Sequence, residues 1–351
     1  MRVVVVGATG NVGTSLLPAL AGDTAVESIL GVARRLPQLD LPKTEWARAD
    51  IAGDDLVPLF RGADADVHLA WAIQPSRDLS QLWRINVEGS TRVFRAAGEA
   101  RVRAVVYASS VGAYSRGPKD EAVDESWPTN GIPTSFYGRH KAEVERRLDR
   151  FEQERPETRV VRLRPGLIFK REAAEGIRRL FAGPFVVNPL VRPSLIPVVP
   201  DVPGLRFQAV HSYDVGEAYR LAVTRDVRGP FNVAAEPVLD PSELARILGA
   251  RRLPFPARAA RRLADLTWRL HLQPTPPGWV DLALGVPILD TTRAREELGW
   301  RPRHSASDAL RDLLAGLREG AGAPTPPLSP ETTRPARIDE LKTGVGEREA
   351  L

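Results

Sequence analysis

The chain has 351 residues, of which 43% are hydrophobic and 26% charged, values typical of one large or two smaller globular domains. It contains no cysteine, which excludes disulfides and cysteine-ligated metal centres, and its five histidines lack the close spacing of a metal-binding pair. The net charge of +5 invites a nucleic-acid partner, but acidic residues alternate with the basic ones and aromatics are not interleaved, so we expect none.

The N-terminal half alternates apolar runs with helical stretches. The apolar runs cover 2–6, 28–33, 67–72, 104–108 and 160–163, and the helical stretches include 11–21, 79–100 and 137–154. The first run is β-branched without polar alternation, as expected of a strand buried on both faces. Alternation of strands and helices predicts an α/β fold, with a Rossmann-type doubly wound parallel sheet over residues 1–165.

After Pro165 the regular alternation of apolar runs and helical stretches ends. Residues 166–319 are expected to form a smaller C-terminal substrate-binding region. Proline-rich residues 183–206 predict irregular structure or short edge strands. Strands are expected at 207–211 and 229–233, and helices from Asp214 onwards and at 256–271, 292–298 and 307–318. Segments near 207–235 are expected to return to the Rossmann domain. Residues 320–351, rich in Pro, Thr, Gly and Glu, are expected to be a disordered tail.

No apolar run approaches the length of a membrane-spanning helix, and the valines after Arg2 are too few for the core of a signal peptide. We therefore expect a cytoplasmic protein. The helix expected at 256–271 is basic and amphipathic, a pattern that suits the wall of an apolar substrate cleft or contact with a membrane surface. Ordinary core packing explains this helix equally well.

A glycine-rich turn joins the first strand to the first helix. Its glycines permit a tight turn, a close approach of the backbone to a pyrophosphate, and packing of the helix on the sheet. The helix N-terminus directs unpaired N–H groups and its dipole toward the phosphates. The turn therefore predicts a dinucleotide site formed by Gly7, Thr9, Gly10, Asn11, Val12 and Gly13.

The end of the second strand bears on the choice of cofactor. An NAD site usually has an acidic residue there, but this chain has Ala33 followed by Arg34 and Arg35. Because a guanidinium fork suits a 2′-phosphate, the sequence favours NADP over NAD. The alternative interpretation is that both arginines are simply solvated.

Three residues form a candidate catalytic group. Tyr137 and Lys141 open an expected helix one turn apart on the same face, and the ammonium and a cationic nicotinamide are both expected to lower the pKa of the phenol. Ser110 follows an expected strand, at the carboxyl edge where open α/β folds bind ligands. Its hydroxyl could polarise a substrate carbonyl.

In order and spacing, these motifs resemble the extended short-chain dehydrogenase/reductases, the NAD-dependent epimerase/dehydratase family, over about the first 320 residues. Further matching segments are 50–51, 68–70, 86–89, 164–169, 211–215 and 298–302. The resemblance implies that Ser110, Tyr137 and Lys141 form a catalytic triad, and that hydride passes between a substrate carbon and the nicotinamide. Cofactor contacts are implied for the glycine turn, the Tyr137–Lys141 pair and Asp50, Ile51, Leu69, Ala70, Trp71, Asn86, Pro165 and Ile168.

Departures from the family pattern reduce the number of reaction classes that fit this chain. Val111-Gly112 replaces the acidic pair of the sugar dehydratases, and Phe169-Lys170-Arg171-Glu172 replaces the Tyr-Gly-Pro segment of nucleotide-sugar members. The first hypothesis is therefore a carbonyl reductase or alcohol dehydrogenase acting on a small molecule. The second is a nucleotide-sugar epimerase with tightly held NAD, and the third a non-catalytic cofactor-binding regulator, against which the Tyr137–Lys141 pair argues. The resemblance also suggests a homodimer formed through 79–100 and 137–154.

Overall fold

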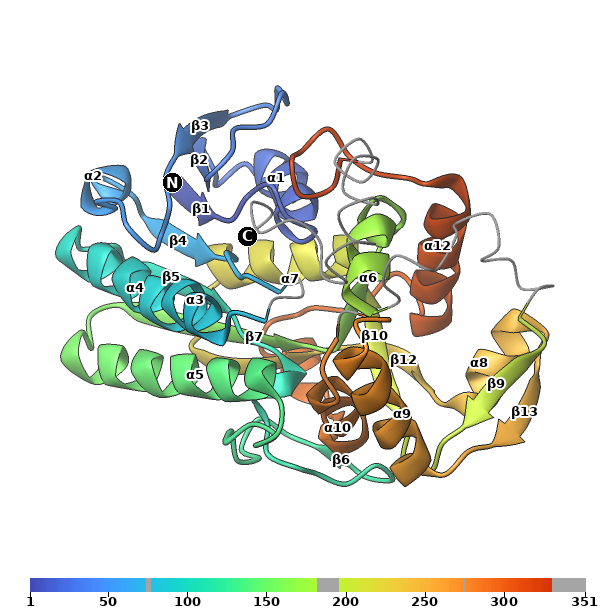
Figure 1. The fold of residues 1–351 in the computed structure, drawn as a ribbon. Coiled ribbons are helices and arrows are strands. Elements are labelled where there is room, and N and C mark those ends of the chain that lie inside the picture. Colours follow the sequence, from blue (N-terminus) through green and yellow to red (C-terminus); the bar gives the residue numbers. More distant parts are fainter. Residues whose placement is uncertain (74–76, 182–195, 274, 330–351) are drawn as a thin grey trace.

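The computed structural model describes residues 1–73, 77–181, 196–273 and 275–329, and its centre is a seven-stranded parallel sheet (Figure 1). The strand order is β11-β7-β5-β4-β1-β2-β3, and every neighbouring pair is parallel. The strands are β1 (Arg2–Val6), β2 (Ser28–Ala33), β3 (Thr44–Arg48), β4 (Ala65–His68), β5 (Ala104–Ala108), β7 (Arg159–Pro165) and β11 (Gly229–Val233). The expected Rossmann-type doubly wound fold is confirmed.

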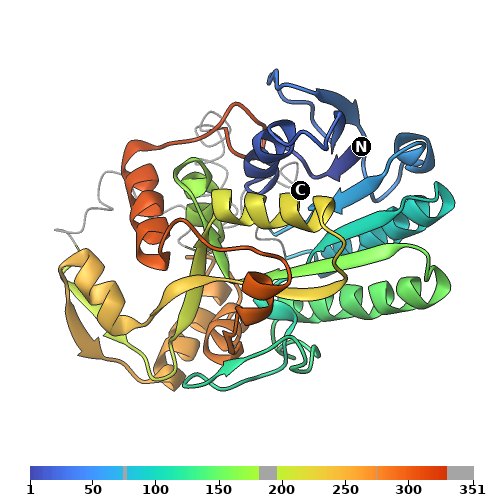
Figure 2. The same cartoon turned by 180° about the vertical axis from the view of Figure 1, so that it is seen from behind.

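Helices cover both faces of this sheet, which explains why β1 is apolar throughout (Figures 1 and 2). Val3 and Val5 belong to the core beneath α1 (Gly13–Ala21) and α7 (Ser212–Thr224), which pack against each other. Val4 and Val6 belong to the opposite core, beneath α2 (Val57–Phe60), α4 (Gly89–Glu99) and α5 (Phe136–Glu154). Burial of both faces removes the need for polar alternation.

The helical stretch expected at 79–100 is interrupted by a wide turn. It consists of α3 (Leu79–Trp83), a single π-helical turn (Arg84–Glu88) and α4. Such turns insert one extra residue into a helix and often mark functional sites. Here the π-helical turn carries Asn86, whose side chain reaches the loop that follows β4.

A smaller part lies against the carboxyl side of the sheet. It contains the three-stranded sheet β12-β10-β8, the pair β13-β9 and the pair β14-β6. The strands are β6 (Ala122–Val123), β8 (Leu167–Phe169), β9 (Val198–Asp201), β10 (Phe207–His211), β12 (Ala235–Leu239), β13 (Arg251–Pro254) and β14 (Ile288–Leu289). The helices are α6 (Ala174–Phe181), α8 (Pro241–Leu248), α9 (Ala257–Arg269), α10 (Gly278–Gly285), α11 (Thr292–Glu296) and α12 (Ala306–Glu319). Short 3₁₀ turns lie at Val111–Ala113 and Arg171–Ala173.

The segment 207–235 is divided between the two parts. The edge strand β11 joins the seven-stranded sheet and α7 covers its face, whereas β10 pairs with β8 and β12 in the smaller sheet. Residues 321–329, which belong to the expected tail, include the buried side chains of Thr325 and Leu328. Residues 330–351 of that tail, and most of the proline-rich segment, lie outside the described residues.

The apolar run expected as a strand at 67–72 is a strand only as far as His68. The Leu69 N–H group still donates to the Val6 carbonyl of the neighbouring strand, at 2.8 Å. Residues 70–72 then leave the sheet at its carboxyl edge, and the centroid of the Trp71 ring lies 6.0 Å from that of the Tyr137 ring. Within the described residues, no helix is long and apolar enough to cross a membrane.

Candidate functional site

The turn between β1 and α1 is closely packed on its neighbours. Gly7 has a φ of +87°, and a Cβ atom there would lie 2.5 Å from the backbone nitrogen of Ala70. A Cβ atom on Gly13 would lie 2.3 Å from the carbonyl oxygen of Ala8. By contrast, the nearest atom to a Cβ on Gly10 would be 3.5 Å away. The first and third glycines thus permit the turn and the helix contact, while Gly10 keeps one side of the turn open.

The polar groups of this turn fit a dinucleotide. The N–H groups of Asn11 and Val12 donate to no acceptor among the described residues, as is usual at a helix start. The buried Oδ1 atom of Asn11 also lacks a hydrogen-bond partner within the described part of the chain, while its Nδ2 atom donates to the Ile168 carbonyl at 3.2 Å. Free donors at a helix N-terminus are the groups that bind phosphate oxygens.

Lys170 supports this turn from the smaller part of the molecule. Its buried Nζ atom donates to the Asn11 carbonyl at 2.9 Å, to Thr14 Oγ1 at 2.6 Å and to Ser15 Oγ at 3.0 Å. Burial lowers the pKa of Lys170 to about 8. Sequence reasoning noted this residue only as a departure from a family motif, because nothing local indicates a contact 159 residues away.

The residues expected around the adenosine half of the cofactor lie at the ends of β2 and β3. Arg34 and Arg35 are exposed directly after β2, and neither forms an ion pair with a residue that the structure describes. Asp50 accepts a hydrogen bond from the Ala52 N–H group at 2.9 Å. Ile51 is buried, and its side chain packs on Gly89. A Cβ atom on Gly89 would lie 2.8 Å from Cγ1 of Ile51.

Asn86 holds the loop after β4 in place. Its Oδ1 atom accepts from the Ala72 N–H group at 2.7 Å, and its Nδ2 atom donates to the Ala72 carbonyl at 3.0 Å. The neighbouring His68 bonds through Nε2 to Ser90 Oγ at 2.8 Å. Burial lowers the pKa of His68 to about 3, so its ring is neutral at physiological pH. Both side chains therefore support the segment that carries Leu69, Ala70 and Trp71.

Tyr137 lies in the first turn of α5, which begins after Ser135, whose side chain accepts from the Gly138 N–H group at 3.3 Å. Its ring lies on the backbone of Gly112, where a Cβ atom would be 2.7 Å from the Tyr137 Cε1 atom. Ser110 Oγ lies 3.4 Å from the same Cβ position and accepts a hydrogen bond from the Gly112 N–H group at 3.0 Å. The structure thus brings Ser110 and Tyr137 together, and Gly112 is a site residue that sequence reasoning missed.

Lys141 lies one helical turn after Tyr137. Its Nζ atom donates to the Ala108 carbonyl at 2.6 Å, lies 3.5 Å from the centroid of the Trp71 indole and lies 5.9 Å from that of the Tyr137 ring. The indole of Trp279, on α10, lies on the other side, with its centroid 5.2 Å from that of Tyr137. Two tryptophans therefore surround the catalytic candidates with apolar surface.

The pKa of Tyr137 shifts in the direction opposite to the one expected from Lys141. Burial raises the pKa of Tyr137 to about 12, and the hydrogen bond with Ser110 offsets only part of that rise. Burial also lowers the pKa of Lys141 well below its usual value. In this arrangement the phenol is neutral and suited to donate a proton.

A buried ion pair fixes α5 to the sheet beneath the site. Glu145, one turn after Lys141, accepts two hydrogen bonds from Arg164 on β7, at 2.8 and 2.5 Å, and one from Ser109 at 2.5 Å. Both partners are almost fully buried. The Arg164 guanidinium holds the pKa of the Glu145 carboxyl below its usual range despite burial. The pair therefore fixes the height of Tyr137 and Lys141 above the carboxyl end of β5.

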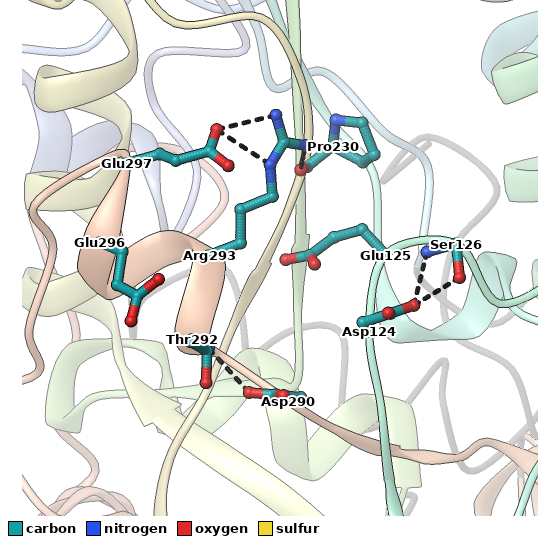
Figure 3. Close-up of a pocket in the computed structure, with 9 residues that line it drawn as sticks. All are labelled: Asp124, Glu125, Ser126, Pro230, Asp290, Thr292, Arg293, Glu296 and Glu297. Carbon is teal, nitrogen blue, oxygen red and sulfur yellow. Dashed lines mark hydrogen bonds and ion pairs between the residues drawn. The ribbon is translucent and has the colours of Figure 1, made fainter.

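A separate hollow of about 540 Å³ lies between β6, β11 and α11 (Figure 3). It is lined by Asp124, Glu125, Ser126, Pro230, Asp290, Thr292, Arg293, Glu296 and Glu297. Its carboxylates do not suit a nucleotide phosphate, and none of the candidate catalytic residues lines it. Arg293 is engaged with Glu297 at 3.0 Å and with the Pro230 carbonyl at 2.5 Å. Among the described residues, no group of three or more potential ligands is arranged to hold a metal ion.

The sequence is similar to known proteins over most of its length. Residues 3–234 match the sequence profile described as the NAD dependent epimerase/dehydratase family. An uncharacterised protein of Mycobacterium tuberculosis is 26% identical over 325 residues, which cover 90% of this chain and 83% of that protein. The 4-hydroxy-2-methyl-3-oxo-4-farnesyl-3,4-dihydroquinoline-1-oxide ketoreductase of Stigmatella aurantiaca is 26% identical over 357 residues, covering 92% of this chain and 98% of the ketoreductase.

The fold is also that of solved structures. The UDP-glucose 4-epimerase of Thermus thermophilus, in complex with NAD, superposes with a TM-score of 0.66 at 22% identity. The superposition covers 91% of this chain and 99% of the epimerase. At this identity the likeness establishes the Rossmann-type architecture and its smaller C-terminal part, and no more.

Proposed function

The chain belongs to the NAD-dependent epimerase/dehydratase family, and on that premise we propose that it is an NAD(P)-dependent oxidoreductase of a carbonyl/alcohol pair. The observation that carries the proposal is the arrangement of Tyr137, which lies with Ser110 around Gly112 and one helical turn from Lys141. A sensor that only binds its cofactor would not need this arrangement. Of the relatives compared, the Stigmatella protein is named a ketoreductase, which agrees with this reaction class.

The proposed chemistry follows from the protonation states. When bound, the nicotinamide supplies a hydride to the carbonyl carbon or removes one from the alcohol carbon. In the reductive direction the neutral Tyr137 phenol donates its proton to the substrate oxygen, and solvent then restores that proton. Ser110 holds the same oxygen by a hydrogen bond. Trp71 and Trp279 exclude water from the reacting atoms.

The cofactor would be held along the carboxyl edge of β1, β2 and β4. We assign the pyrophosphate to the turn that contains Gly7, Thr9, Gly10, Asn11, Val12 and Gly13. The nicotinamide half would contact Leu69, Ala70, Trp71, Tyr137, Lys141, Pro165 and Ile168, and Asp50 and Ile51 would border the adenine. Asn86 would act mainly through Ala72, which it already holds. The exposed Arg34 and Arg35 support NADP as the preferred form, since they are free to bind a 2′-phosphate.

A nucleotide-sugar epimerase with tightly held NAD is the second candidate. It is favoured by the Thermus thermophilus structure, which is an epimerase in complex with NAD and shares this fold over nearly its whole length. Such an enzyme transfers the hydride out and back within one turnover, so it need not exchange its cofactor. The state and exchange of the bound nucleotide therefore separate the two candidates.

The test is to denature freshly purified protein, identify any released nucleotide, and titrate the protein with NADPH and NADH in parallel. Exchangeable binding of NADPH, followed by oxidation of NADPH with a panel of ketones, is the expected result. Tightly held NAD that does not exchange would support the epimerase instead. Failure to bind either nucleotide would overturn both enzymatic proposals. Dimerisation through residues 79–100 and 137–154 stays a prediction, which light scattering of the same sample would check.

A further inference from the structure

Helix α9 exposes a row of leucines to solvent. Leu263, Leu266 and the C-cap residue Leu270 are 53%, 54% and 58% exposed, and no residue of α9 is buried. At about 100° per residue, these three positions lie within an arc of about 60° on one side of the helix. Single exposed leucines are common on protein surfaces, but three on one side of a helix form an apolar patch of the kind that binds another surface.

Arginines line one side of this leucine row. Arg258, Arg262 and Arg269 lie within a neighbouring arc of about 40° by the same spacing. Arg269 forms an ion pair with Asp265 at 2.9 Å. Arg258 and Arg262 form none with any residue of the described segments, so their charge is available to a partner.

The opposite side of α9 attaches the helix to the protein. Arg261 pairs with Asp281 of α10 at 2.8 Å, and Arg77 donates to the Trp268 carbonyl at 2.5 Å while lying 4.4 Å over the Trp268 ring. Trp268 and Ala264 face this attached side and are half-buried. The helix is therefore fixed, with its leucine row and its arginine row directed away from the contacts that hold it.

We propose that α9 docks the protein on an anionic phospholipid surface, with the leucine row entering the interface and Arg258 and Arg262 contacting lipid phosphates. An amphipathic helix with an apolar face bordered by basic residues is the arrangement that binds in the plane of a bilayer. Two copies of the chain would be a poorer occupant, because pairing two leucine rows about a twofold axis brings arginines of equal charge together. Because α9 packs on α10, which carries Trp279, docking places the bilayer on the substrate side of the molecule.

The test is co-sedimentation of the full chain with vesicles of phosphatidylcholine, with and without phosphatidylglycerol. One variant, Leu263→Gln with Leu266→Gln, removes the apolar row, and a second, Arg258→Gln with Arg262→Gln, removes the charge. The matched control is Leu36→Gln with Leu79→Gln, since these leucines are also about half exposed but lie on other elements. Thermal unfolding and light scattering of each variant accompany the binding assay.

We expect the wild type and the control to bind vesicles that contain phosphatidylglycerol. Both α9 variants should bind at least about tenfold more weakly, with unchanged unfolding temperatures, because the altered side chains are exposed. Absence of wild-type binding, or equal binding to vesicles without phosphatidylglycerol, would overturn the proposal. So would a wild-type dimer that the leucine variant dissociates without any vesicle binding, since a second copy would then occupy the row.

Discussion

The ring of Tyr137 lies directly on the backbone of Gly112, so close that a Cβ atom on Gly112 would be 2.7 Å from Cε1 of the ring. Ser110 Oγ, two residues earlier, lies 3.4 Å from the same Cβ position. The turn after β5 therefore sets the height of the phenol and places the Ser110 hydroxyl beside it. This contact joins segments that are 25 positions apart in the sequence, and it explains why the position after Val111 is glycine rather than a larger residue.

We expect Gly112→Ala to lower kcat by about tenfold to a hundredfold, because the added methyl group displaces the phenol from its reacting position. Cofactor affinity should change little, since Gly112 is not part of the turn between β1 and α1. The matched control is Gly53→Ala, where a Cβ atom meets nothing within 4 Å. Unchanged turnover in Gly112→Ala would show that the position of the ring does not limit the reaction.

Tyr137→Phe should lower kcat by at least about a hundredfold while cofactor affinity is retained, because only the proton donor is lost. Tyr213→Phe is the control, since that tyrosine is half exposed and, among the described residues, its hydroxyl forms one long hydrogen bond of 3.5 Å, to Glu172. Steady-state kinetics and fluorescence titration of NADPH measure the two quantities. Loss of cofactor binding together with turnover would argue against the proposed role.

The raised pKa of Tyr137 also predicts how stability depends on pH. In the unfolded chain the phenol ionises near pH 10, but in the folded chain it ionises only near pH 12, so the unfolded state loses its proton first. The free energy of unfolding should therefore fall as the pH rises from about 10 to about 12. Urea unfolding of the wild type and of Tyr137→Phe measures this contribution. The variant should lose less stability, by up to about 1.4 kcal/mol per pH unit.

The sequence predicts those features of the site that depend on local spacing. The interval between Tyr137 and Lys141 is one helical turn wherever a helix forms, and a glycine turn after a buried strand has few alternative structures. What it does not predict are contacts between distant segments. Lys170 reaches Asn11, and Trp279 reaches Tyr137, through the packing of the smaller part on the sheet.

The sequence also does not predict the pKa values of the site residues, because these depend on how deeply each side chain is buried. The proximity of a lysine suggested a lowered pKa for Tyr137, but the same burial that raises the pKa of the phenol also disfavours the charge on Lys141. The predicted end of the strand at 67–72 is also wrong. The apolar residues 70–72 continue the pattern of β4, yet they leave the sheet, and Asn86 binds the backbone of Ala72.

Lys170→Met should weaken cofactor binding by about tenfold, because the start of α1 loses three hydrogen bonds that fix the turn. Lys119→Met is a closely matched control. Burial lowers the pKa of Lys119 to about 8 as well, but its Nζ atom donates to the carbonyls of Arg206 and Ala283, away from the turn. Isothermal titration with NADPH compares the two variants. Equal weakening in both would indicate a general loss of stability.

The choice between NADP and NAD depends on the two arginines after β2. Arg34→Ala should weaken NADPH by about tenfold and NADH by less than about twofold, since only NADPH has a 2′-phosphate for the guanidinium to bind. Arg301→Ala, which removes another exposed arginine without an ion pair in the described structure, should change neither affinity. If Arg34→Ala weakened both nucleotides equally, the arginines would contribute only general charge. A preference for NADH in the wild type would instead place them in solvent, and the enzyme would use NAD despite the alanine at position 33.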